Sequence, residues 1–482
     1  MIRRNSLFAA SATILIAGML AGCGASKPVA LPPVTPLPLN FTGTADSSGI
    51  GQLNWRQVFA DKHLTNLIDS ALANNTDLLA ASQRIEMSKA QYLLSRGNLL
   101  PSLNASITAG GDKYGDYTMN GVGNFDTNLS GNINEKQKIP APVTPDFFLG
   151  LRSSWEIDIW GKLKQQRRAA AARFAASNAG RQLIVTMLVA EVANLYYELL
   201  TLDTELKILQ KNILLQESAL DIVRIQKEGG RATELAIQQF RAQLLNTQEQ
   251  QYTVSQRIVA TENQLNAIIG RYPAPILRDT SLMQQRIPQS IRVGLPSQLL
   301  QQRPDIRRAE FELEAAKADV AAVRKAFYPS LTLTPYAGFN AFKAGLLLNG
   351  GSVAYGALGG LTAPLFNQNK LRAGLNIANA QHKEAIYQYQ KVLLNSYGEV
   401  VTQLNSLENN RRAFQLKQQE VNELSNAVNT AKELYLTGYA SYLEVITAQK
   451  GVLDAELQLA TNKKESFQSL VGLYRALGGG WN

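Results

Sequence analysis

The chain has 482 residues and a formal net charge of +10, and it contains one cysteine and two histidines. A single cysteine excludes an intramolecular disulfide framework, and two histidines with six methionines give no support for a soft-metal relay or another metal site. The basic balance would suit nucleic acid or anionic lipid. However, the basic residues are scattered among acids along helical stretches, so a solvated helix surface explains them and no nucleic-acid partner is expected.

The N-terminal residues have the layout of a lipoprotein signal. Two arginines precede an apolar run, and small residues stand directly before Cys23. This order is typical of a secretory signal peptide, so residues 1–22 are predicted to be removed. We expect Cys23 to carry covalent acyl chains such as palmitate and expect no other cofactor; an incidental buried thiol is the alternative. Several acyl chains anchor a protein stably without a spanning helix.

Residues 23–54 are rich in proline and lack a hydrophobic period, so they are predicted to form a lipidated, extended tether. The folded part is expected to begin at Trp55. Beyond the signal, no run of about 18 uncharged apolar residues exists. The best candidate, residues 183–200, is interrupted by Glu191 and Glu198, and we therefore expect no transmembrane helix.

The folded part consists of two related halves. The segment around Pro101 aligns with the segment around Pro329, and a second, gapless set of matches pairs Gly230 with Gly438. Such internal similarity predicts a duplicated structural unit. The two predicted repeats are residues 55–290 and 291–482.

Each half contains a long proline-free run with coiled-coil spacing. Five leucines and an isoleucine from Leu195 to Ile213 alternate spacings of four and three, and apolar residues recur every seven from Leu407 to Tyr435. These patterns predict long helices with a narrow apolar stripe, as in a wall with one wet face. A helix over 162–228 would be about 100 Å long, which no compact globule needs. The expected helices are 77–98, 162–228, 231–269, 305–327, 368–436 and 442–477.

Four segments between the helices alternate apolar and polar residues with a period of two. Strands of about ten residues with one apolar and one polar face are what a membrane barrel with a wet lumen requires. Half-buried strands of a soluble protein show the same alternation, so this alternative stays open here. The predicted strands cover about 102–111, 147–160, 330–342 and 352–365.

Four strands cannot close a barrel, because about eight are needed just to enclose side chains. In lipid, an open sheet edge would also leave backbone groups unsatisfied. Several copies must therefore share one barrel. The Asn- and Gly-rich segment 112–145 fits an exposed loop on its outer side.

With these features, the chain resembles the outer membrane factor family, the TolC-like exit ducts of tripartite efflux pumps. The resemblance is strongest to the lipoprotein branch of that family. The likeness covers essentially the whole mature chain. The strings that carry it are 20–23, Trp55–Phe59, Trp155–Gly161, Arg303–Arg307 and Leu473–Trp481. The resemblance implies a mainly α fold with a membrane β part. Duplicated helix-strand-strand-helix halves would form, as a homotrimer, a twelve-stranded β-barrel continuous with a long periplasmic α-helical barrel.

The resemblance also implies a location and partners. The chain would be a lipid-anchored outer-membrane protein with a long periplasmic domain. It would contact outer-membrane lipids, a periplasmic membrane-fusion adaptor and an inner-membrane transporter, most simply of the RND type. Its role would be the passive conduction of drugs or other small toxic compounds, as in multidrug resistance.

In this family the duct closes at the periplasmic helix tips, near the glycine turns. By position, Tyr435, Leu443 and Glu444 are the candidate gate residues. Helix packing remains the alternative for Leu443, and a solvated helix face remains the alternative for Glu444. Three copies of Glu444 around a narrow axis would favour cations and repel one another. The candidate adaptor-docking residues are Gly230, Ala232, Thr233, Gly438, Ala440 and Ser441.

The chain departs from its relatives near the second glycine turn. Thr447 and Lys450 stand where relatives often have an acid and an arginine, and Ala440 replaces an arginine found in some members. The resemblance therefore carries over neither a second ring of acidic side chains nor the contact that would hold the closed duct.

Catalysis has no support in the sequence. No nucleophile elbow, phosphate loop or zinc spacing occurs, so the chain is not expected to be an enzyme. Two other functions remain alternatives: a channel for a type I-like protein or oligosaccharide secretion system, and a non-conducting, lipid-anchored coiled-coil scaffold. The four alternating strands argue against the scaffold, which has no use for them.

Overall fold

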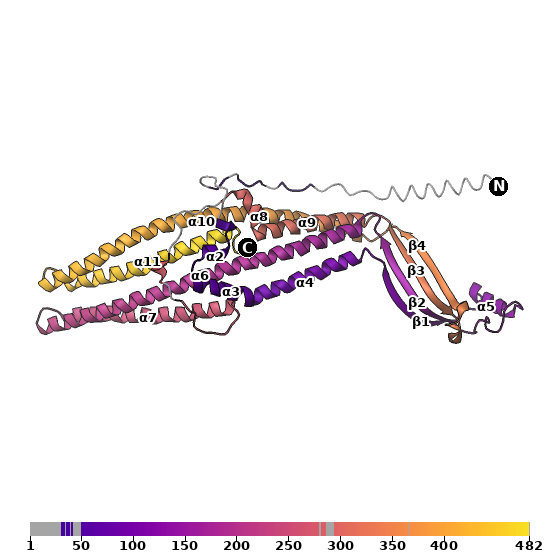
Figure 1. Ribbon diagram of the computed structural model, residues 1–482, viewed down its shortest axis with the longest axis horizontal. Helices are drawn as coiled ribbons and strands as arrows, with labels where there is room; N and C mark the ends of the chain where they lie inside the picture. Colours follow the sequence, from indigo (N-terminus) through magenta and orange to yellow (C-terminus); the bar gives the residue numbers. More distant parts are fainter. Residues whose placement is uncertain are drawn as a thin grey trace. The chain divides into compact units, whose positions relative to one another are not determined.

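The computed structural model describes residues 30–33, 35–38, 40–41, 50–278, 281–285, 294–364 and 366–481 (Figure 1). The chain divides into two compact units. Unit 1 comprises Met1–Pro32, Ser88–Phe174 and Glu312–Ala385, and unit 2 comprises Pro33–Met87, Ala175–Phe311 and Ile386–Asn482. Each unit takes segments from both predicted repeats, because the strands of the two halves join one sheet.

All the predicted helices and strands are present, within three residues at each end. The helices are α2 (Trp55–Val58), α3 (Lys62–Asn74), α4 (Thr76–Gly97), α5 (Met119–Leu129), α6 (Lys162–Glu228), α7 (Glu234–Ile268), α8 (Leu299–Gln302), α9 (Pro304–Lys325), α10 (Lys370–Thr437) and α11 (Tyr442–Ala476). The strands are β1 (Ser102–Asp112), β2 (Thr144–Ile157), β3 (Ser330–Ala341) and β4 (Val353–Thr362). Short 3₁₀ turns are η1 (Ile50–Gln52), η2 (Leu282–Gln284), η3 (Pro296–Gln298), η4 (Ala344–Leu346) and η5 (Gly350–Ser352).

Unit 1 contains one antiparallel sheet in the order β1-β2-β3-β4 (Figure 1). Its register places Ile107, Leu149, Phe339 and Val353 in one row across the four strands. The predicted alternation is thus confirmed, since these residues share a face. Ile107 and Val353 are 79% and 56% exposed, so within this chain little covers the apolar face at the two outer strands.

The predicted strand 147–160 is wrong at both ends, since β2 begins and ends three residues earlier. The chain leaves the sheet after Ile157 because the Asp158 side chain binds the start of the following helix. Its carboxylate accepts hydrogen bonds from the backbone N–H groups of Leu163 (3.0 Å) and Lys164 (2.8 Å). These are among the N–H groups of the first turn of α6 that have no partner within the helix, so Asp158 caps α6 rather than extending the strand.

The predicted loop 112–145 contains a helix, α5. Thr118 begins it by accepting a hydrogen bond from the Gly121 N–H (3.1 Å), and the Asn128 side chain exchanges two hydrogen bonds with the backbone of Ile139 (2.8 Å each). The Asn- and Gly-rich composition of the segment gives no indication of the Thr118 cap. The loop is therefore partly ordered by its own side chains.

The described part of the predicted tether is extended but packs along α10. Phe41 is buried and stacks on Tyr397 with ring centroids 5.4 Å apart, and Gln390 donates to the Thr35 hydroxyl (2.9 Å). The folded part therefore begins before Trp55. Cys23 lies outside the described residues, and its lipidation stays a prediction.

The apolar seam of α6 forms part of the core of unit 2. Leu199, Leu202 and Leu209 are at most 1% exposed, as the heptad spacing predicts. Among the described residues, α6 is also the one helix long and apolar enough to cross a membrane, with a mean hydropathy of 1.5 in its best window, which differs from the expectation of none. However, 61% of that window is buried inside the protein, and a core helix has this property.

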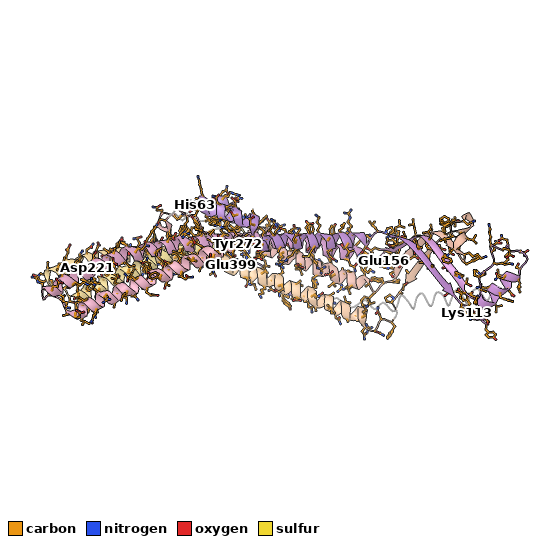
Figure 2. All side chains as sticks on the ribbon, turned by 90° about the horizontal axis from the view of Figure 1, so that it is seen from below. His63, Lys113, Glu156, Asp221, Tyr272 and Glu399 are labelled. Carbon is orange, nitrogen blue, oxygen red and sulfur yellow. The ribbon has the colours of Figure 1, made fainter. Side chains whose placement is uncertain are left out.

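The Arg303 motif of the sequence forms a buried ionic clamp in unit 2. Arg303 is 6% exposed, and it donates to both carboxylate oxygens of Asp305, to Glu399 (2.9 Å) and to the Ala476 carbonyl oxygen (2.6 Å). Glu399, labelled in Figure 2, also pairs with Arg475. Burial opposes the charge, but the two carboxylates outweigh it and raise the pKa of Arg303. The clamp ties the start of α9 to α10 and to the end of α11.

Candidate functional site

The candidate site is the pair of turns that join the long helices of unit 2. In Figure 1, α7 runs back along α6 and α11 runs back along α10. We call residues 227–236 the first tip turn and residues 435–444 the second tip turn; each includes the end of one helix and the start of the next. Asp221, labelled in Figure 2, lies on α6 near the first of them.

Both tip turns end their helices in the same way. Gly230 and Gly438 have backbone φ angles of +75° and +85°, which residues with a side chain rarely adopt. The N–H of each glycine bonds the carbonyl three residues back (2.9 and 3.2 Å), and the next N–H bonds the carbonyl five residues back (2.8 Å in both). This is a Schellman motif, which satisfies the last carbonyls of a helix, so the duplicated glycines have one structural role.

The helices that leave the turns are capped by side chains. The Thr233 hydroxyl accepts from the Ala236 N–H (3.3 Å), and the Ser441 hydroxyl accepts from the Leu443 N–H (3.3 Å). The Glu444 carboxylate in turn accepts hydrogen bonds from the Ser441 N–H (2.9 Å) and from the Ser441 hydroxyl. This reciprocal capping box is present in the second turn.

The two turns differ in their charges. In the first turn Lys227 and Glu234 form an ion pair. The second repeat has Tyr435 in place of Lys227. The acidic residue in the first turn of its returning helix is Glu444. Hydrogen bonding from Ser441 holds the pKa of Glu444 below its usual range, which favours the charged carboxylate.

The three predicted gate residues differ in their exposure. Leu443 is 57% exposed and stands beside the exposed Glu444 in the first turn of α11. Tyr435 is half-buried, and its hydroxyl is buried without a hydrogen-bond partner. Burial raises the pKa of Tyr435. The structure thus brings Leu443 and Glu444 to the surface and directs the Tyr435 hydroxyl inward.

The predicted docking residues form the surface of the two turns. Gly230, Thr233, Gly438 and Ser441 are exposed, whereas Ala232 and Ala440 are half-buried. The prediction missed two large apolar residues beside them: Tyr439 is 86% exposed and Leu235 is 55% exposed. Leu235 is the counterpart of Leu443 in the first repeat, so both tips present a leucine at the second position of the returning helix.

A cavity lies behind the turns, among α6, α7, α10 and α11. Its volume is about 160 Å³. Apolar residues such as Phe240 and Val445 line it, and so do Gln216, Tyr435 and Gln449. These three polar side chains each have a buried oxygen without a hydrogen-bond partner, and Gln216 also has such a nitrogen. Sequence reasoning missed this feature, although glutamine in an apolar seam is a visible signal.

Further groups at the tips bear on the predicted departures. Thr447 and Lys450 are exposed on α11, and no described acidic residue forms an ion pair with Lys450. Among the described residues, no group of three or more histidine, cysteine, aspartate or glutamate side chains could hold a metal ion.

Comparison with known proteins places this architecture. Residues 67–271 and 295–479 match the family model described as outer membrane efflux protein. The pyoverdine export outer membrane protein OpmQ of Pseudomonas aeruginosa is 30% identical over 97% of this chain and 96% of its own length. The probable outer membrane lipoprotein SilC of Salmonella typhimurium is 27% identical over 96% of this chain and 97% of its own.

A solved structure agrees with the sequence relatives. The open state of the MtrE outer membrane channel of Neisseria gonorrhoeae covers 94% of this chain and 98% of its own, with a TM-score of 0.81 and 25% identity. Proteins of this kind are efflux ducts in the outer membrane, not enzymes. The chain belongs to the outer membrane efflux protein family, and it is an outer-membrane exit duct of an efflux system.

Proposed function

We propose that the chain works as a homotrimer in which three four-stranded sheets close one twelve-stranded barrel. The exposed apolar face of the sheet and the unpaired outer edges of β1 and β4 support this, because lipid tolerates a β-sheet only when every edge is paired. The trimer then conducts passively. A covalent lipid on Cys23 is an auxiliary tether rather than the main anchor.

The tip turns are proposed to dock to a periplasmic membrane-fusion adaptor, which links the duct to an inner-membrane transporter, most simply of the RND type. The equivalent exposed residues Leu235 and Leu443 support two related contacts per chain. An adaptor with paired apolar sockets fits such repeated leucines. Co-purification of the adaptor with the intact protein, and its loss in a Leu235→Ser, Leu443→Ser double variant, tests this contact.

The gate is proposed to lie at Leu443 and Glu444 of the second tip turn, with Tyr435 supporting the turn from inside. One observation carries this proposal: an exposed leucine stands next to a carboxylate that hydrogen bonds from Ser441 hold in place. Three such carboxylates around an axis favour cations in a narrow pore.

The cargo is proposed to be small toxic compounds. Relatives are named for pyoverdine export, for toluene and solvent efflux and for cation efflux. Identification of the transporter that co-purifies with the adaptor is the measurement that assigns the substrate class.

The gate is tested by Glu444→Gln in single-channel recordings from planar bilayers. Glutamine still completes a capping box, so the helix start is retained while the charge is lost. We expect lower cation selectivity and a changed conductance. Glu234→Gln is the matched control, because it removes the same charge from the first tip turn. If Glu444→Gln left both conductance and selectivity unchanged, the gate assignment would be wrong.

A further inference from the structure

The cavity behind the tip turns interrupts an otherwise apolar seam of α6. Leu202, Leu209, Gln216 and Val223 follow one another every seven residues, and each is at most 1% exposed. A residue in such a seam normally packs against the facing helix. Gln216 therefore occupies a core position where a leucine would be expected, and the second repeat has Leu424 at the equivalent place.

Gln216 is buried without satisfying its amide. Both its oxygen and its nitrogen lack a hydrogen-bond partner within the protein, and a glutamine side chain offers two donor hydrogens and an acceptor. The Tyr435 hydroxyl and the Gln449 side-chain oxygen line the same cavity and are also unpaired. Buried polar groups almost always have partners, so three unpaired groups around one space indicate an occupant that supplies them.

The size and lining of the cavity restrict that occupant. An apolar cavity of about 150 Å³ accepts a benzene ring, and this cavity has a volume of about 160 Å³. Phe240, Val223 and Val445 give it apolar walls. Among the described lining residues none is acidic, and the one with a formal charge, Lys432, is exposed. Because an unpaired charge is costly to bury, a neutral molecule is favoured.

We propose that this tip cavity is a binding site for a neutral single-ring molecule of the phenol class, which fills the apolar walls and exchanges hydrogen bonds with Gln216, Tyr435 and Gln449. Such an occupant contacts α6 and α7 on one side and α10 and α11 on the other. The site does not depend on the proposed gate, since it is defined by its walls and its unpaired polar groups.

The probes are para-fluorophenol and para-fluorotoluene, titrated into the detergent-solubilised full-length protein and followed by fluorine NMR. We expect saturable binding of fluorophenol that unlabelled phenol displaces, with about tenfold preference over fluorotoluene, the size of a typical hydrogen-bond contribution. Absence of saturable fluorophenol binding would mean that water alone fills the cavity, and the proposal would be overturned.

The variant Gln216→Leu introduces the residue of the second repeat, and it should abolish the preference for fluorophenol. Gln210→Leu is the matched control, because it makes the same substitution at an exposed position on α6 and should retain the preference. Gln449→Leu provides a second test if Gln216→Leu does not assemble. A preference for fluorophenol that survives both cavity substitutions would also overturn the proposal.

Discussion

Substitution of Arg303 by methionine should destabilise unit 2 strongly. Methionine is unbranched and only slightly smaller in volume than arginine, so the change removes four hydrogen bonds to Asp305, Glu399 and Ala476 while it leaves little empty space. Glu399 keeps its ion pair with Arg475. Asp305 loses its charged partner, and the buried Ala476 carbonyl oxygen loses the donor that Arg303 supplied. Breaking a buried ion pair from one side costs about 3–5 kcal/mol. We therefore expect a loss of about 4 kcal/mol in the free energy of unfolding.

The assay is chemical denaturation followed by helical circular dichroism, with Arg224→Met as the control. Arg224 pairs with Asp221 on the exposed face of α6, where its side chain is 54% exposed, and such a pair contributes under about 1 kcal/mol. If Arg303→Met cost no more than Arg224→Met, the clamp would not hold α9 to α10 and α11, and this reading of the Arg303 motif would be refuted.

Three further predictions concern the tips and the N-terminus. Gln216→Leu should raise the free energy of unfolding by about 1–3 kcal/mol, because it removes a buried, unpaired amide; a decrease in the same denaturation assay would contradict this. The pKa of Glu444 is lowered by folding, so its stabilisation of the second tip turn is complete above the unfolded value of about 4.3 and is lost as the pH falls through the lower folded value. Hydrogen-exchange protection of this turn should therefore fall only below that pH in the wild type and stay flat in Glu444→Gln. Cys23→Ala, given an ordinary cleavage site, should reach the membrane less efficiently yet still assemble; a soluble monomer would show that the lipid is the true anchor.

The helices could be predicted closely because their signals are local. The heptad spacing and the absence of proline locate α6, and Gly230 ends it where a positive φ is needed. The face on which each strand residue lies also follows from the alternation of apolar residues, since a shift by one position would turn every side chain to the other face.

The errors arose where a side chain serves the backbone of another element. Asp158 fits the strand alternation, but its carboxylate caps α6, so the strand stops early. Thr118 and Asn128 order a segment whose composition indicates a loop. Composition and periodicity do not show which backbone group a side chain will bind, so these hydrogen bonds could not be predicted.

The candidate site was only partly accessible to sequence reasoning. The tip turns follow from the duplicated glycines, whereas the inward position of the Tyr435 hydroxyl and the cavity depend on how four helices pack. The signal for the cavity is present in the sequence, since Gln216 stands three residues after Ile213 and continues the leucine seam. The Glu444 capping box was also visible, as a serine followed three residues later by a glutamate.

The most direct test of the account is the conductance of the purified protein in a planar bilayer, measured on the species whose mass has been determined. We predict that a species of three copies inserts and gives discrete conductance steps of one size. A stable trimer that inserts without conducting would contradict the account, and would favour a coiled-coil scaffold over an exit duct.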